Sequence, residues 1–268
     1  MTLICIFRLK HIRWPSNIIA THKPPECTGL LKRGQIMGED ARKDQCKDEA
    51  LIEKQIIERM SHISSELAHD LRSPLQTIQN AIYLIQRNPS NEQLFVMVKQ
   101  SLTQTTEILD SFRDYYKAHI LMRLEVDPVK VVELAFSELP VPDNIKVIKE
   151  MGETQHINID PSKMALAIRK LLINSIEAMP GGGELTVKVS EDPICVTITI
   201  GDTGEGISPD VAEVIFTPFL ANNKKGNGLG LPTTKRVVEC HGGEICFTSI
   251  AGEGTVFTVK LPRSSVNL

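Results

Sequence analysis

The sequence predicts an α+β protein in two parts: an antiparallel helical hairpin that dimerises to a four-helix bundle, followed by an α/β two-layer sandwich. Apolar residues recur every three or four positions over residues 48–87 and again over 94–116, the period of a helix with one buried face. After about residue 122 the pattern changes to short strand-like runs with helices between them, which is typical of a sheet covered by helices. A chain of 268 residues is long enough for both parts.

The predicted boundaries divide the chain into an irregular N-terminal arm at residues 1–46, a dimerisation domain at 47–121 and the sandwich at 122–268. The arm shows no sustained period and holds several prolines and glycines, which break regular structure. Beyond it, residues 48–87 carry one continuous apolar stripe, and residues 94–116 carry a second. The turn between the stripes contains Pro89, so we expect a hairpin. A lone hairpin exposes half of its core, which a symmetric dimer would cover.

The sandwich is expected to begin with a short helix that Asp127 and Pro128 start and that runs to Leu139. The elements expected after it are strands at Ile145–Met151 and His156–Asp160, a helix at Pro161–Met179, strands at Glu184–Val189 and Ile194–Gly201, a helix from about Leu229 to Cys240, and strands at Glu244–Ser249 and Thr255–Leu261. Glycine-rich turns follow Met179 and join the last two strands.

Composition narrows the function classes. The net charge of -3 gives no general attraction to nucleic acid, so we expect no nucleic-acid partner. None of the six cysteines forms a CxxC pair, which favours a reducing, cytoplasmic compartment. No run of about 20 apolar residues is present, so we expect no membrane span.

His69 is a candidate nucleophile on the first helix. It lies two positions from Leu67 and from Leu71, about 200° around the helix from that stripe, and therefore faces outward. An exposed imidazole has a nucleophilic ring nitrogen, and Asp70 beside it could hold the other nitrogen and accept its proton. Taken alone, the same pattern also fits a solvated polar face that contains a histidine.

Asp202 follows the strand Val196–Ile200 with the parity of its apolar side chains, so it is expected to point toward the core. A buried carboxylate needs donors, and an amine such as that of adenine could supply one. Gly204 and Gly206 would let a flat ring approach the backbone. An Asx-turn that ends the strand is the alternative.

A glycine-rich segment precedes the helix that begins near Leu229. Lys224, Lys225 and Gly226 are followed by Gly228 and Gly230, and glycines before a helix N-terminus expose amide hydrogens that favour phosphate. The spacing is neither a Walker A loop nor a Rossmann fingerprint. A flexible loop that caps the helix is the alternative.

Asn174 stands in the middle of the helix at Pro161–Met179, among apolar residues, where asparagine is a poor helix former. Its amide oxygen is a neutral, hard ligand of the kind that Mg²⁺ accepts when it shares its shell with phosphates. An exposed or capped polar residue is the alternative.

Six segments, in this order, resemble the boxes of sensor histidine kinases of two-component systems. They are residues 65–75 (SELAHDLRSPL), 171–180 (LLINSIEAMP), 202–206 (DTGEG), 216–219 (FTPF), 226–231 (GNGLGL) and 252–257 (GEGTVF). The resemblance implies a histidine phosphotransfer domain in the hairpin and an ATP-binding domain in the sandwich.

By this resemblance His69 is the phosphoacceptor, Asp70 its base, and Ser73 the residue that supports dephosphorylation of the partner. Asn174 would coordinate Mg²⁺, and Asp202 would bind the adenine amine. The other nucleotide-binding positions implied are Gly204, Gly206, Lys224, Lys225, Gly226, Gly228, Leu229, Gly230, Leu231 and Thr255.

The resemblance further implies that a homodimer uses ATP and Mg²⁺, phosphorylates His69 and passes the phosphoryl group to an aspartate of a separate response regulator. The chain departs from the family at Lys170, where many members carry asparagine four residues before the magnesium ligand. Two alternatives remain open: a degenerate dimeric scaffold that binds a response regulator, and an ATP-driven conformational clamp like those of gyrase, mismatch-repair proteins and heat-shock chaperones.

Overall fold

The computed structural model describes residues 64–137, 139–219 and 228–263. The arm predicted at residues 1–46, the first part of the first predicted helix, and Lys224, Lys225 and Gly226 lie outside these ranges. Within them, no helix has both the length and the apolar character that a membrane crossing requires.

The hairpin is present as predicted. Residues 64–87 are helical, here called the His69 helix, and α2 (Glu92–Tyr116) follows after a short turn. Asn91 caps α2, because its side chain accepts a hydrogen bond from the N–H of Gln93 at 3.1 Å. This cap satisfies one of the free amides at the helix start and fixes where the turn ends.

The hairpin buries one seam of side chains within a single chain. On α2 the buried residues are Leu94, Ser101 and Ile108, spaced by seven, and on the His69 helix they include Pro74 and Ala81, with the same spacing. A seven-residue repeat of this kind is typical of two helices that pack along their length.

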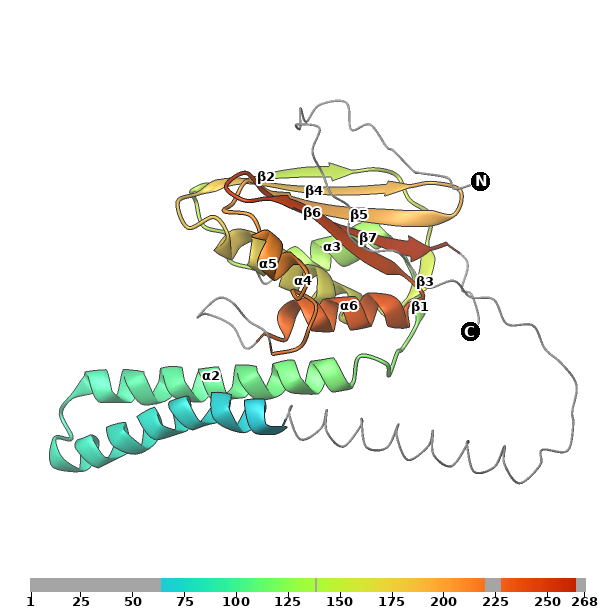
Figure 1. Ribbon diagram of the computed structural model, residues 1–268. Helices are drawn as coiled ribbons and strands as arrows, with labels where there is room; N and C mark the ends of the chain where they lie inside the picture. The colour runs from blue at the N-terminus through green and yellow to red at the C-terminus, as the bar shows by residue number, and fades with distance from the viewer. Residues whose placement is uncertain (1–63, 138, 220–227, 264–268) are drawn as a thin grey trace, which may run out of the picture. The chain divides into compact units, whose positions relative to one another are not determined.

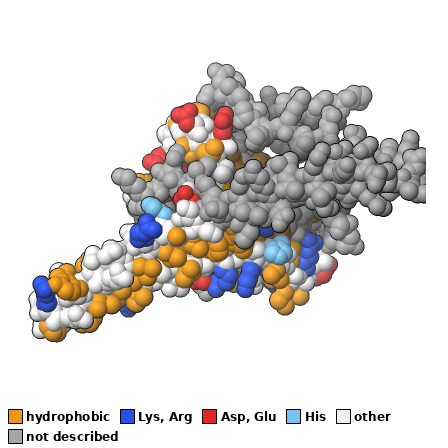
Figure 2. Space-filling view, turned by 60° about the horizontal axis from the view of Figure 1, so that its bottom comes forward, with side chains coloured by type: hydrophobic (Ala, Val, Ile, Leu, Met, Phe, Trp, Pro, Cys, Tyr) orange, Lys and Arg blue, Asp and Glu red, His pale blue; other side chains and the backbone are white. Residues whose placement is uncertain are grey.

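A second apolar stripe runs beside this seam and remains open. Phe95, Leu102 and Leu109 on α2 are each about half exposed, as are Leu75 and Ile82 on the His69 helix. Figure 2 shows hydrophobic side chains gathered along the hairpin. The single apolar stripe predicted for each helix therefore divides into a buried seam and an exposed one.

The sandwich contains seven strands and four helices in the described ranges. In chain order they are β1 (Leu124–Val126), α3 (Pro128–Phe136), β2 (Ile145–Met151), β3 (Ile157–Ile159), α4 (Pro161–Glu177), β4 (Gly183–Glu191), β5 (Cys195–Asp202), α5 (Pro209–Ala212), α6 (Gly230–Cys240), β6 (Glu244–Ile250) and β7 (Gly254–Pro262). The predicted helical hairpin followed by an α/β sandwich is confirmed. The short helix α5 was not predicted, and α3 ends before Leu139.

Five strands form the main sheet in the order β2-β4-β5-β7-β6, while β1 and β3 pair separately. Strands β2 and β4 are parallel, and the other neighbours are antiparallel. Helices α3, α4 and α6 cover one face of this sheet (Figure 1). The register of β5 against β7 pairs Asp202 with Thr255, so two predicted site residues lie side by side at one end of the sheet.

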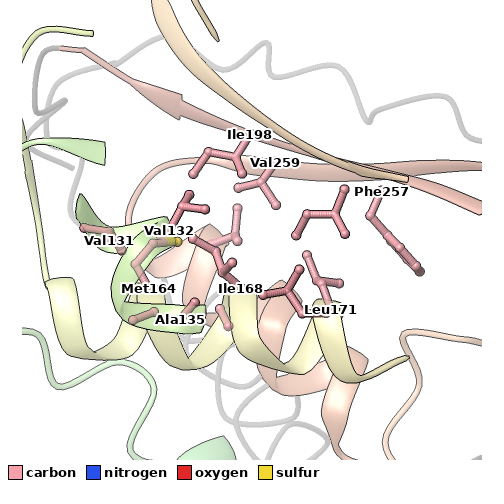
Figure 3. Packing of buried hydrophobic residues seen from close by; sticks show 14 of the residues in the cluster. Val131, Val132, Ala135, Met164, Ile168, Leu171, Ile198, Phe257 and Val259 are labelled. Carbon is pink, nitrogen blue, oxygen red and sulfur yellow. The ribbon is translucent and has the colours of Figure 1, made fainter. Parts of the chain in front are cut away.

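The core lies between the sheet and its helices. Along β5, residues alternate between buried and half-buried positions, which is the period of a strand with one face in the core. Figure 3 shows Ile168 and Leu171 of α4 facing Ile198 of β5 and Val259 of β7. All four are at most 1% exposed, so this core is closed within one chain.

A junction of hydrogen bonds holds the segment after α2 against α4 and α6. The Asp160 carboxylate caps α4 and also accepts from the N–H of Met122 at 2.8 Å. The N–H of Asp160 donates to Nε2 of His241, the residue that follows α6, at 2.9 Å. Arg123 donates to the carbonyl of Cys240 at 2.9 Å. The junction therefore ties the start of the sandwich to the ends of two of its helices.

Candidate functional site

His69 faces solvent, as predicted: its side chain is 79% exposed. Its Nδ1 lies 3.4 Å from Oδ1 of Asp70. The ring shares a shallow, open surface pocket with Arg72, Ser73, Gln76 and Thr77. The pair is too exposed to add much stability, so the contact matters mainly because it orients the ring and turns Nε2 away from the carboxylate.

The backbone next to His69 is interrupted by proline. Pro74 has no N–H, so it cannot donate to the carbonyl of Asp70, its normal partner one turn earlier in a helix. The Thr77 hydroxyl donates to the carbonyl of Ser73 at 3.1 Å. Because Pro74 itself is buried, the break in hydrogen bonding lies on a packed helix and close to the exposed imidazole.

Asp202 is buried at the end of β5, as its parity predicts, with 6% of its surface exposed. One carboxylate oxygen, Oδ1, accepts from the N–H of Gly204 at 3.0 Å and from the N–H of Thr255 at 3.2 Å. Burial raises the pKa of the Asp202 carboxyl, while these two amides and the Ser175 hydroxyl oppose that shift. A carboxyl fixed in this way can accept a further hydrogen bond from a bound amine.

Gly204 and Gly206 have a role that the sequence did not reveal. A side chain on Gly204 would collide with the carbonyl of Ala178, and one on Gly206 would collide with the carbonyl of Ile250. Gly206 also has a φ of 67°, a left-handed conformation that favours glycine. The chain's own backbone therefore requires both glycines, whether or not a planar ligand approaches them.

Thr255 makes hydrogen bonds through both its backbone and its side chain. Its N–H donates to Asp202, and its hydroxyl lies 2.9 Å from the hydroxyl of Ser249 on β6. Ser249 in turn accepts from the N–H of Ile207 at 2.8 Å, which ties the loop after Asp202 to the sheet. Sequence reasoning missed Ser249, because one serine near a strand end carries no distinctive pattern.

Ser175 was also missed, although the sequence contains a signal for it. It follows Ile168, Leu171 and Leu172 at helical spacing, and it is 1% exposed. A hydroxyl on the buried face of a helix needs a polar partner. The Ser175 hydroxyl has no hydrogen-bond partner among the described residues, but it lies near enough to the Asp202 carboxyl to lower the pKa of that group.

Asn174 is half-buried on α4 and lies near the first residue of α6. Its amide oxygen is 4.0 Å from the position that a side chain on Gly230 would occupy, so glycine leaves the space beside this oxygen open. A neutral oxygen next to a helix N-terminus fits a Mg²⁺ ion that is shared with phosphates.

The start of α6 can offer backbone amides to an anion. Within the part of the chain that the structure describes, no side chain caps this helix, so the N–H groups of Gly230 and Leu231 in its first turn can face an anion. Leu229 is 1% exposed and Leu231 packs against the core, so neither side chain is available to a ligand. Gly228 has a φ of 65° and accepts a hydrogen bond from the N–H of Phe219 at 3.1 Å.

Lys170, where the chain departs from the family's asparagine, lies half-buried on α4. Burial lowers the pKa of its ammonium group, and the carboxylate of Asp114 on α2 acts in the opposite direction. Lys170 therefore lies close enough to α2 for the Asp114 carboxylate to affect its pKa. It stands one helical turn before Asn174.

Comparison with known proteins gives a consistent result. Residues 159–265 match the family described as histidine kinase-, DNA gyrase B-, and HSP90-like ATPase. The chain is 32% identical to sensor histidine kinase ZraS of Salmonella typhi over 225 residues, which are 80% of this chain and 48% of that protein. It is 27% identical to sporulation kinase A of Bacillus subtilis over 239 residues, 85% of this chain and 39% of that protein. The chain thus spans about half or less of these relatives.

Solved structures agree on the fold. Histidine kinase AdeS of Acinetobacter baumannii superposes with a TM-score of 0.61 at 20% identity, covering 73% of this chain and 98% of that one. Histidine kinase ThkA, solved in complex with response regulator protein TrrA, superposes with a TM-score of 0.65 at 21% identity, covering 82% and 67%. Both carry the arrangement of hairpin and sandwich described above.

Proposed function

Because the chain belongs to the histidine kinase family and carries that family's ATPase domain at residues 159–265, we propose that it is an ATP-dependent protein-histidine kinase that phosphorylates His69. The main support is that the His69 imidazole faces outward, is oriented by the Asp70 carboxylate, and lies on the same chain as this ATPase domain. In the proposed division, residues 47–121 carry the histidine and residues 122–268 carry the nucleotide.

The proposed transfer follows from the orientation of the ring. Nδ1 faces Asp70, so Nε2 attacks the γ-phosphorus of ATP. A P–N bond forms, the bond to the bridging oxygen breaks, and ADP leaves. The proton on Nδ1 passes to the Asp70 carboxylate, which keeps the product ring neutral. Positioning and charge neutralisation supply most of the catalysis in phosphoryl transfer.

In the proposed nucleotide site, the Asp202 carboxyl accepts from the adenine amine, and the amides at the start of α6 face the phosphates. Mg²⁺ would neutralise phosphate charge when bound, with the Asn174 oxygen in its shell. Lys224, Lys225 and Gly226 are proposed as further phosphate contacts from the segment before α6.

The proposed partners are a second copy of this chain and a response regulator. The half-exposed stripe that includes Leu102 and Leu109 supports the homodimer. Ser73, on the same open surface as His69, is proposed to support dephosphorylation of the regulator's aspartate. A cytoplasmic site of action is proposed as well, which fits the free thiols of Cys195, Cys240 and Cys246.

The test is incubation with γ-labelled ATP and Mg²⁺, comparing the native chain, His69→Gln and His119→Gln. His119 is also exposed but lies outside the phosphoacceptor segment, so it is a matched control. We expect acid-labile, base-stable label on the native chain and on His119→Gln, and none on His69→Gln. Undiminished label on His69→Gln would reject the assignment. A chain that binds nucleotide and never acquires label would instead be a scaffold or a clamp.

A further inference from the structure

Helices α4 and α6 lie side by side (Figure 1), and contacts join them at three levels. At the start of α4, the N–H of Asp160 donates to Nε2 of His241, which follows the end of α6, at 2.9 Å. Halfway along, the hydroxyl of Thr234, a fully buried residue, donates to the carbonyl of Ala167 at 3.3 Å. At the third level, the amide oxygen of Asn174 lies beside the first residue of α6. The two helices therefore form one antiparallel unit.

The two ends of this helix pair meet different parts of the molecule. At one end lie Asn174 and the amides at the start of α6, where the nucleotide site is proposed. At the other end lie residues 117–123, here called the linker, which follow α2. Fourteen residues separate Asp160 from Asn174, about 20 Å at the helical rise. Because a packed interior transmits displacements, a shift of the linker against this pair moves the nucleotide site relative to the hairpin.

Asp160 binds the linker with an oxygen that the cap of α4 does not use. Its Oδ1 accepts from the N–H groups of Ser162 and Lys163, both at 3.1 Å, and so caps α4. Its Oδ2 accepts from the N–H of Met122, in the linker, at 2.8 Å. Asp160 is 5% exposed, so these bonds lie in surroundings of low dielectric, where they are stronger than in water. One side chain thus joins the linker to the first turn of α4.

Two further bonds fix the linker at the same end of the helix pair. The Nζ of Lys163 donates to the carbonyl of Lys117 at 2.6 Å. Arg123 donates to the carbonyl of Cys240, the last residue of α6, at 2.9 Å, and its charge suits the negative end of that helix. Ala118, between these contacts, has no exposed surface. Both helices of the pair therefore bind the linker.

We propose that Asp160 is a positioning residue for phosphotransfer: by fixing the linker to the α4–α6 pair, it sets where the nucleotide site lies relative to His69. The inference rests on the proposed function, since it needs a nucleotide at Asn174 and a phosphoryl acceptor at His69. Asp160 acts through the linker and not on the reacting atoms. Transfer requires reacting atoms about 3–3.5 Å apart, and a displacement of about 1 Å can slow a reaction about 100-fold.

The variant Asp160→Asn separates the two roles of this side chain. Asparagine caps helices as well as aspartate does, so its Oδ1 can still cap α4. Its amide nitrogen takes the place of Oδ2, and because this group donates and cannot accept, the N–H of Met122 loses its partner. We expect amide hydrogen exchange at Met122 to become at least about tenfold faster. Transfer of label from γ-labelled ATP to His69 should slow at least about tenfold, while the affinity for a non-hydrolysable ATP analogue stays unchanged.

Asp127→Asn is the matched control. Asp127 caps α3 as Asp160 caps α4: its Oδ1 accepts from the N–H of Val129 at 2.9 Å, and proline follows it at the first helical position. Among the described residues, its carboxylate makes no hydrogen bond to the linker. Neither the exchange at Met122 nor the transfer of label should therefore change.

A second variant loosens the linker without altering a helix cap. Arg123→Met removes the donor to the carbonyl of Cys240 and should slow transfer at least about threefold. Arg123→Lys keeps a charged donor and should restore part of the rate. Neither change should alter the affinity for the ATP analogue.

Unchanged exchange at Met122 in Asp160→Asn would overturn the contact, and unchanged transfer would overturn its positioning role. Faster transfer would also overturn that role, because the contact would then restrain the reaction. An equal loss in Asp127→Asn, or a weaker affinity of Asp160→Asn for the analogue, would assign the loss to a weakened cap or to nucleotide binding instead. All these outcomes leave the proposed function standing. A native chain that never acquires label on His69 would reject that function, and the positioning role with it.

Discussion

The hairpin and the sandwich bury their apolar side chains in different ways. In the sandwich, residues such as Leu171, Leu172 and Ile200 have no exposed surface, so one chain closes the core. In the hairpin, Leu102 and Leu109 are each about half exposed although they recur as regularly as the buried residues beside them. Regular apolar spacing predicts a packed face in both parts, but it does not reveal whether the packing partner belongs to the same chain.

The largest expected effect comes from placing charges in the exposed apolar stripe of the hairpin. We expect Leu102→Glu combined with Leu109→Glu to give monomers, because two charges would face the same two charges across a symmetric seam. Sedimentation velocity measures the change. Leu134→Glu is the control: Leu134 is 45% exposed on α3 of the sandwich, and its replacement should leave the association state unchanged. A double variant that stays dimeric would mean that the open stripe is not the interface.

The second prediction acts on the closed core. Leu171→Ala should destabilise the sandwich by about 2–5 kcal/mol, since it removes a fully buried side chain and leaves a cavity. Urea unfolding followed by the fluorescence of a nucleotide analogue measures this loss. The hairpin should still associate, because its seams do not include Leu171. A cost below about 1 kcal/mol would show that the core relaxes into the gap, which a closed core should resist.

The smallest expected effect is on the pH dependence of stability, where the buried His241 should differ from the exposed His119. His241 is 2% exposed, and its ring accepts from the N–H of Asp160 and lies 2.7 Å from the carbonyl of Val237. Burial lowers the pKa of His241 below its ordinary 6.5. The unfolded chain therefore binds more protons near that pH, so stability is present above about pH 6.5 and falls as the pH drops below it.

Urea unfolding at pH 7.5 and pH 5.5 tests this sign. His241→Gln should reduce the difference between the two pH values, whereas His119→Gln, at an exposed position, should leave it as in the native chain. A native chain that is more stable at pH 5.5 than at pH 7.5 would contradict the assignment of a neutral, buried His241.

Much of the fold could be predicted because local rules control it. Helical spacing located α4 and placed His69 outside the buried stripe, and strand parity placed Asp202 in the core. The remainder depends on contacts between distant segments. No local pattern joins Ser249 to Ile207, and the glycines after Asp202 are required by carbonyls of Ala178 and Ile250, which lie elsewhere in the chain.

The pairing of Asp202 with Thr255 has a consequence for biosynthesis. The two residues are 53 positions apart, and their hydrogen bond needs β7, which is synthesised after every other described element. Both helices of the hairpin and α4 are made earlier and rest on local contacts, whereas pairing across such a separation is slow. The carboxyl proposed to recognise adenine thus acquires its Thr255 donor only after the rest of its surroundings has been synthesised, so a chain released before β7 would lack that donor.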